Sequence, residues 1–324
     1  MLIKKKSVMV VLLLGFVVLF FSILADQQVE GQSKIQIYTS IYPLHDLASR
    51  IVGDKFELEL VVPNGIEIHG YEPSPRKIAR LEKADLFFYI GLGLESWAEK
   101  VVQNLEEAGV KTVRVTKDLK LLELEEHDHS NCNCHEHHGH EHHDHEHHGH
   151  TYDPHVWLDP FNMKEIAYLI TEELIRLDQG NQEFYRANYR DYAAEIKQLD
   201  REFKEGLAEK KREYVLVSHS AFGYLGKRYG FKQLSVTGIS PDQEPTPGSL
   251  ARLIGEVKEH NLEYIFLETL ASPKTVDVLA DEADLQVLEL NPVAGLTAED
   301  IAGGEDYFSL MRKNLANLKK ALVE

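Results

Sequence analysis

Strand-like and helix-like segments alternate along most of this 324-residue chain. Short runs of β-branched and aromatic residues predict strands, and apolar residues recur at helical spacing between them. The predicted strands cover residues 35–39, 56–62, 85–90, 112–115, 214–218, 231–236, 264–268 and 286–290. Strands that alternate with helices pair in parallel and are covered by helices on both faces. The sequence therefore predicts an α/β fold.

Two helical patterns separate the strands into two groups. One runs from Met163 to about Leu177, and a longer one from about Gln182 to Lys211 has no internal proline. A helix this long can join two lobes, although a surface helix packed on one sheet is the alternative. We predict two lobes, each with a mainly parallel sheet flanked by helices, and a cleft between them. The predicted N-terminal lobe is 33–180, the linker helix is 181–211 and the C-terminal lobe is 212–324.

Residues 1–25 form a separate segment. Three lysines precede a largely apolar run of 17 residues from Val8 to Leu24. This pattern is typical of a secretory signal peptide, with a cut after Ala25, or of an uncleaved membrane anchor, and the run length leaves both open. In either case the positive residues place the rest of the protein outside the cytoplasm, either secreted or periplasmic or held on the outer face of the cell membrane.

The segment 127–150 contains 12 of the 17 histidines, with two cysteines and five carboxylates. It has almost no apolar side chains, so it cannot contribute to a core. Imidazole, thiolate and carboxylate at this density favour Zn²⁺ among the common cations, which predicts a low-affinity metal loop. Its candidate ligands are His127, His129, Cys132, Cys134, His135, His137, His138, His140, His142, His143, His145, His147, His148 and His150.

The net charge of the chain limits its partners. The formal charge is −18, and it becomes about −21 if Lys4–Lys6 leave with a signal peptide. Such an acidic chain with no basic patch is not expected to bind nucleic acid through phosphate contacts. An acidic surface does raise the local concentration of cations, although it also serves solubility.

Three histidines outside the tract stand where strands end or loops begin: His69, His155 and His219. In open α/β sheets, ligands bind beyond the carboxyl ends of the strands. If these imidazoles converge, they make most of a tetrahedral zinc site. The alternative is three unrelated histidines, and spacing alone does not separate the two. His45 and His260 lie within predicted helices and are not expected to bind metal.

Several segments together resemble a known family. They are IYTSIYPLHDLASRIVG, VVPNGIEIHGYEPSPRKIARLEKADLFFYIGLGLESW, DPHVWLDPFN, SHSAFGYLGKRYG, GISPDQEPTPGSLARLI and LNPVAGLT. In this order they are similar to the metal-binding subunits of zinc and manganese ABC transporters. The resemblance covers nearly everything from Ile35 onward. It implies two α/β lobes joined by one rigid long helix, with the metal in the cleft and, in zinc-selective members, a histidine-rich loop before the second ligand.

Matched position by position, the resemblance implies that His69, His155 and His219 are the metal ligands. Histidine at the third position favours zinc over manganese, because Mn²⁺ prefers harder oxygen ligands. The family often has an aspartate where this chain has Asn291, so the fourth coordination place is left to water, Glu67 or Glu268. Some zinc members also have glutamate directly before the first histidine, where this chain has Ile68.

The leading hypothesis is thus an extracytoplasmic, high-affinity zinc-binding protein that delivers Zn²⁺ to an ABC importer. Its partners would be a permease with its ATPase, and we expect a monomer. The cleft histidines must be neutral to bind, so affinity should fall as the pH approaches about 6. The alternatives are zinc storage or cell adhesion through the histidine tract, and a zinc hydrolase. No HExxH motif or nucleophile elbow is present, so we predict that the protein is not an enzyme.

Overall fold

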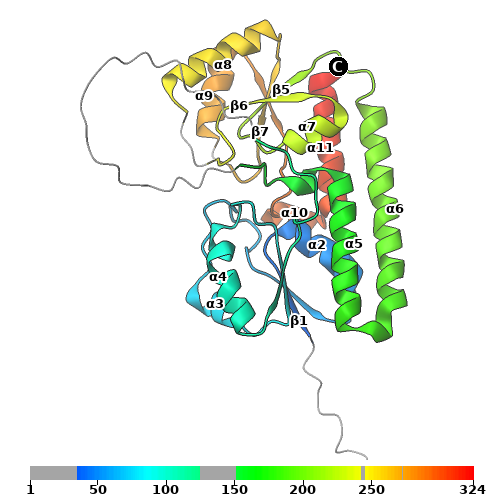
Figure 1. The fold of residues 1–324 in the computed structure, drawn as a ribbon. Coiled ribbons are helices and arrows are strands. Elements are labelled where there is room, and N and C mark those ends of the chain that lie inside the picture. The colour runs from blue at the N-terminus through cyan, green and yellow to red at the C-terminus, as the bar shows by residue number, and fades with distance from the viewer. Residues whose placement is uncertain (1–34, 125–150, 242–244, 272) are drawn as a thin grey trace, which may run out of the picture. The chain divides into compact units, whose positions relative to one another are not determined.

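The computed structural model describes residues 35–124, 151–241, 245–271 and 273–324. It contains two four-stranded parallel sheets (Figure 1). The first has the strands β1 Gln36–Thr39, β2 Glu57–Leu60, β3 Leu86–Tyr89 and β4 Lys111–Arg114, in the order β2-β1-β3-β4. The second has β5 Tyr214–Val217, β6 Lys232–Ser235, β7 Tyr264–Leu267 and β8 Gln286–Glu289, in the order β6-β5-β7-β8. Both sheets and all eight predicted strands are therefore confirmed.

The two sheets repeat the same strand order. In each, the second strand along the chain lies outside the first, and the third lies on the other side. The strand order therefore reverses between β1 and β3 in one sheet and between β5 and β7 in the other. Such switch points leave a crevice beyond the carboxyl ends of the strands. Residues that directly follow β5 and β7 are thus in the right place to form a site.

Helices flank both sheets because the crossover between parallel strands needs them. In the first lobe these are α2 Tyr42–Val52, α3 Pro75–Leu81 and α4 Ser96–Glu107. In the second they are α7 Gly223–Tyr229, α8 Pro247–Glu259 and α9 Lys274–Ala283, followed by α10 Ala298–Gly303 and α11 Tyr307–Leu322. Central strands are buried on both faces, as Leu86, Phe87 and Phe88 of β3 show with no exposed surface. Because both faces are buried, the alternation of apolar and polar residues that is typical of half-exposed strands is absent from these central strands.

A long helix links the lobes. α5 (Pro160–Leu177) and α6 (Gln182–Gly206) lie side by side, and α6 is the longest helix in the described parts of the chain (Figure 1). α6 ends at Gly206 and not at Lys211, because glycine has a low helix propensity. This glycine also lets α11 approach closely, since a Cβ there would lie 3.0 Å from Leu315 Cδ1. α5 starts earlier than predicted, at Pro160, where the Asp159 carboxylate accepts the N–H of Phe161 at 2.8 Å.

The predicted signal peptide or anchor (1–25) and the predicted low-affinity metal loop (127–150) lie outside the described residues. Among the helices that the structure describes, none is at once long and apolar enough to cross a membrane.

Candidate metal centre

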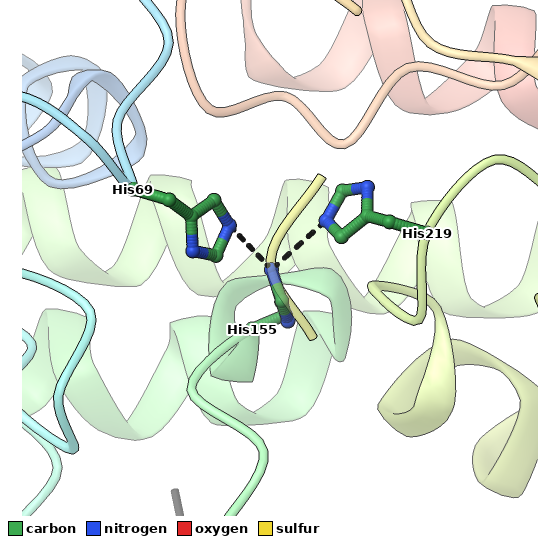
Figure 2. A group of neighbouring side chains, drawn as sticks. All are labelled: His69, His155 and His219. Atoms are coloured by element: carbon green, nitrogen blue, oxygen red, sulfur yellow. Dashed lines mark hydrogen bonds between the residues drawn. The ribbon is translucent and has the colours of Figure 1, made fainter. Parts of the chain in front are cut away.

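Three histidine side chains from separate loops converge on one point (Figure 2). His69 lies in the loop between β2 and α3, and His219 follows Ser218 directly beyond β5. His155 precedes a short 3₁₀ helix, Val156–Leu158, which leads into α5. One nitrogen of each ring lies within 4.8 Å of the corresponding nitrogen of both others. The structure thus brings together all three histidines that the sequence placed at loop positions.

The spacing between the ring nitrogens fits one small cation. Nε2 of His155 lies 3.3 Å from Nε2 of His69 and 3.4 Å from Nε2 of His219. A tetrahedral zinc with Zn–N bonds of about 2.0–2.1 Å separates its nitrogen ligands by about 3.3–3.4 Å. The distances from His155 to the other two rings therefore equal the edge length of a tetrahedral zinc coordination sphere, while the His69–His219 pair lies within 4.8 Å.

Two of the rings are held by buried carboxylates. Asp153 Oδ1 accepts hydrogen bonds from Nδ1 of His155 at 2.8 Å and from its backbone N–H at 2.9 Å. Glu268 Oε1 accepts the backbone N–H of His219 at 3.2 Å and contacts Nδ1 of the same ring. A carboxylate on Nδ1 fixes the tautomer, so the lone pair of a neutral ring lies on Nε2 and points at the centre. Two facing lone pairs repel each other unless a cation lies between them.

The centre is more open on one side. His155 and His219 are 1% and 2% exposed, whereas His69 is half-buried. The ring of His155 also packs against Trp157, with ring centroids 5.4 Å apart, and Nε1 of Trp157 donates to the carbonyl of Pro292 at 2.6 Å. The side of the group nearest His69 is therefore the more accessible to a cation, while His155 and His219 lie in the interior.

The candidates for the fourth ligand are already engaged in other contacts. The Glu268 carboxylate is hydrogen-bonded to Nδ1 of His219 and also accepts a hydrogen bond from the hydroxyl of Ser218. Glu67 accepts the backbone N–H of His69 at 3.1 Å, and burial raises the pKa of its carboxyl group although this N–H opposes the shift. Asn291 is 2% exposed, and its Oδ1 accepts the N–H of Val293 at 2.7 Å.

A small cavity separates these three side chains. It is lined by Glu67, Glu268 and Asn291 together with Ala294 and Gly295, and it leaves about 10 Å³ for the centre of a water-sized molecule. That is roughly the space that one water molecule needs. A small oxygen ligand therefore fits beside Glu67, Glu268 and Asn291, in a cavity that none of the three histidines lines.

The two remaining histidines of the described chain make ordinary contacts elsewhere. His45 lies near Thr39, with Nδ1 3.3 Å from Oγ1, and burial lowers its pKa. His260 is the C-cap of α8, lies 3.3 Å from a carboxylate oxygen of Glu256 and stacks on the ring of Tyr214. Neither joins the three-histidine group.

Sequence reasoning missed Asp153 and assigned Glu268 only as a candidate ligand. Asp153 stands two residues before His155, so the local motif Asp-Pro-His was a signal for an orienting carboxylate. Glu268 lies 49 residues from His219, and only the pairing of β5 with β7 brings them together. Such a partner has no local signature in the chain.

Two α/β lobes joined by a long helix, with three histidines from different loops at one point, define a metal-binding protein of the substrate-binding type. The model of the family described as "ZnuA: Zinc-uptake complex component A periplasmic" matches residues 37–321. The chain therefore belongs to the ZnuA family.

Individual relatives agree with this assignment. The high-affinity zinc uptake system protein ZnuA of Bacillus subtilis is 37% identical over 290 residues, which are 90% of this chain and 88% of that protein. Zinc-binding AdcA proteins of streptococci are longer, and this chain spans 60–61% of their length.

Solved structures are similar as well. The Zn(II)-bound ZnuA-like domain of Streptococcus pneumoniae AdcA matches with a TM-score of 0.74 and 33% identity, over 90% of this chain and 100% of that one. The laminin-binding protein Lbp of Streptococcus pyogenes matches with a TM-score of 0.73 and 31% identity, over 89% and 99% of the two chains.

Proposed function

We propose that this protein captures Zn²⁺ outside the cytoplasm through His69, His155 and His219 and delivers it to an ABC-type importer. The observation that carries the proposal is the position of Nε2 of His155, which lies 3.3 Å from Nε2 of His69 and 3.4 Å from Nε2 of His219. Membership in a family of zinc-uptake components supports the transport role and the extracytoplasmic location. The partners would be a membrane permease and its ATPase.

A zinc titration against a chelator of known affinity tests this proposal. The full chain should show one tight site together with several weak ones. The double variant His69→Ala, His219→Ala should lose the tight site alone. The matched control is His45→Ala, His260→Ala, which removes two histidines that lie outside the group. A tight site that survives in the first variant, or is lost in the control, would contradict the assignment.

We propose zinc as the preferred cargo over manganese. Three imidazole nitrogens suit Zn²⁺, whereas Mn²⁺ favours carboxylate and water oxygens. The nearby carboxylates Asp153 and Glu268 are committed to ring nitrogens and are therefore not positioned as oxygen ligands. Competition at equal concentrations should favour Zn²⁺ by at least about 100-fold, a margin consistent with the Irving–Williams order.

For the fourth coordination place we propose a water molecule. The cavity beside Glu67, Glu268 and Asn291 has space for one, and the contacts of Glu268 and Asn291 engage them elsewhere. Glu67 is the alternative, because the described contacts of its carboxylate are with backbone N–H groups of Ile68 and His69 and not with a ligand ring. Glu67→Gln should leave affinity almost unchanged if water is the ligand. A loss of more than about tenfold would favour the carboxylate.

A site with three histidines and water on zinc is also the composition of a hydrolytic centre. We propose that it does not act as one, because Asp153 and Glu268 are hydrogen-bonded to the ligand rings and neither is available as a general base. A zinc-dependent rate of ester hydrolysis that disappears in His219→Ala would overturn this view.

Adhesion is the second candidate function, since a laminin-binding protein is among the structural neighbours. It would not exclude zinc capture. Solid-phase binding of the zinc-loaded full chain to laminin, with the metal-free chain as the comparison, tests it. Saturable binding would support a surface role, and binding no greater than to albumin would exclude it.

Two further points concern assembly. All three ligands come from one chain, so a second copy is not needed to complete the site, and we propose a monomer. Storage or buffering by the histidine tract 127–150, and membrane attachment through residues 1–25, are proposals that depend on sequence alone.

A further inference from the structure

The two segments that flank the histidine tract are paired with each other. Leu122–Leu124 precedes the tract, and Thr151–Asp153 follows it. The N–H of Leu124 donates to the carbonyl of Thr151 at 3.1 Å, the N–H of Asp153 donates to the carbonyl of Leu122 at 2.8 Å, and Glu123 forms an antiparallel bridge with Tyr152. The flanks thus form a short ladder that ends at Asp153, two residues before His155.

One side chain of the second lobe binds both strands of this ladder. The phenol oxygen of Tyr224, on α7, accepts the N–H of Leu122 at 2.9 Å and donates to the carbonyl of Asp153 at 3.1 Å. Tyr224 is 4% exposed, and burial raises its pKa to about 12, so the hydroxyl keeps its proton at neutral pH. Both hydrogen bonds therefore persist over the physiological range.

The residue before this tyrosine faces the carboxylate of Asp153. A Cβ on Gly223 would lie 2.6 Å from Asp153 Oδ2, which is closer than real Cβ contacts. Only glycine leaves the carboxylate in its present place. The other oxygen, Oδ1, holds the backbone N–H and Nδ1 of His155. α7 thus binds the backbone of Asp153 through Tyr224 and leaves room for its carboxylate at Gly223.

We propose that Tyr224 and Gly223 are positioning residues of the metal centre, which hold His155 through Asp153 and thereby slow the release of zinc. This inference rests on the proposed zinc site. A ring that is free to turn loses the alignment of Nε2 with the ion, and the loss of an outer-shell partner typically costs 10–100-fold in metal affinity. Because the site pre-exists in the folded chain, most of that loss should appear in the dissociation rate.

The test uses the full chain loaded with zinc and mixed with excess chelator. The slow phase of release reports the three-histidine site, provided that it disappears in His69→Ala, His219→Ala. Tyr224→Phe removes only the hydroxyl and should accelerate this phase at least about fivefold. Tyr229→Phe is the matched control, because Tyr229 is a buried tyrosine on the same helix whose hydroxyl lies 3.2 Å from Asp200 Oδ1. The slow phase of zinc release from Tyr229→Phe should have the same rate as in the unmodified chain.

A second pair of variants separates positioning from a general loss of stability. Gly223→Ala pushes on the Asp153 carboxylate. Gly226→Ala, on the same helix, instead places a Cβ 2.6 Å from the carbonyl oxygen of Phe231, which lies beyond the end of α7. Only the first should speed release and change the visible absorption spectrum of bound Co²⁺, which reports ligand geometry.

Two outcomes would overturn the inference. In one, Tyr224→Phe releases zinc at the unmodified rate. In the other, both members of each pair accelerate release equally, which would indicate loosening of α7 as a whole. If the unmodified chain shows no slow phase that depends on His69 and His219, the proposed zinc site itself fails.

Discussion

The carboxylate of Glu268 forms two hydrogen bonds with His219, one with the backbone N–H at 3.2 Å and one with Nδ1 of the ring. Glu268 directly follows β7 and His219 lies beyond β5, so the pair spans the switch point of the second sheet. Asp153 makes the same two contacts with His155. The candidate metal centre thus contains two pairs of a histidine and a carboxylate, while His69 is half-buried in the loop after β2.

Glu268→Gln should weaken zinc binding at the tight site by about 10–100-fold. The amide can donate to Nδ1 as well as accept from it, so the ring is no longer held in one tautomer. Chelator competition at neutral pH measures the change. The control is Glu256→Gln, since Glu256 lies 3.3 Å from His260 in a carboxylate–histidine pair on α8, away from the centre. Equal losses in both variants would show that Glu268 has no special role.

Zinc should stabilise the folded chain, because the ligands come from loops of both lobes. At a free zinc concentration 100 times the dissociation constant, the expected gain is about 2.7 kcal/mol if the unfolded chain does not bind. Urea unfolding with zinc and with excess chelator measures it. In His69→Ala, His219→Ala the gain should vanish. A gain that persists there would have to come from sites elsewhere in the chain.

Replacement of residues 127–150 by a short Gly-Ser linker should remove the weak zinc equivalents and keep the tight site. The flanking segments are already paired through Leu124, Thr151 and Asp153, so a short loop closes them at little entropic cost. Zinc stoichiometry and the slow release phase are the measurements. Loss of all tight binding in the replaced chain would mean that the tract supplies ligands to the centre.

Asp200 predicts how stability depends on pH. Its carboxylate accepts from Nε of Arg228 at 2.8 Å and from Nζ of Lys204 at 2.8 Å. Burial opposes ionisation, but these two cationic partners outweigh it and lower the pKa of Asp200 in the folded chain. Asp200 therefore makes its full contribution to the free energy of unfolding above the pKa of about 3.9 that the carboxyl group has in the unfolded chain. This contribution is lost as the pH falls through the lower pKa of the folded chain.

Asp200→Asn should accordingly cost on the order of 2 kcal/mol at pH 7, the value of hydrogen bonds to charged groups. The difference in free energy of unfolding between Asp200→Asn and the unmodified chain should become smaller below about pH 4, where Asp200 is already protonated in the unfolded chain. Urea unfolding at pH 7, 5 and 3.5 measures it. Asp191→Asn, an exposed position on the same helix, is the control and should change little at any pH. A constant difference across this range would contradict the assigned role of the ion pairs.

Local patterns in the chain determined much of this protein. Strand and helix periodicity predicted both parallel sheets, and the loop positions of His69, His155 and His219 marked them as candidate ligands. These features could be predicted because each depends on residues near one another along the chain. The early end of α6 at Gly206 was missed, since helix ends depend on single residues and their tertiary neighbours.

Tertiary structure alone decided which side chains share the centre and what holds them. The 3.3 and 3.4 Å spacing of the Nε2 atoms, the contact of Glu268 with His219, and the binding of Tyr224 to both flanks of the tract join residues 49–102 positions apart. No local pattern encodes such distances. They follow from the pairing of strands and the packing of α7 against the ladder, which fix atoms to within ångströms only once the whole core has formed.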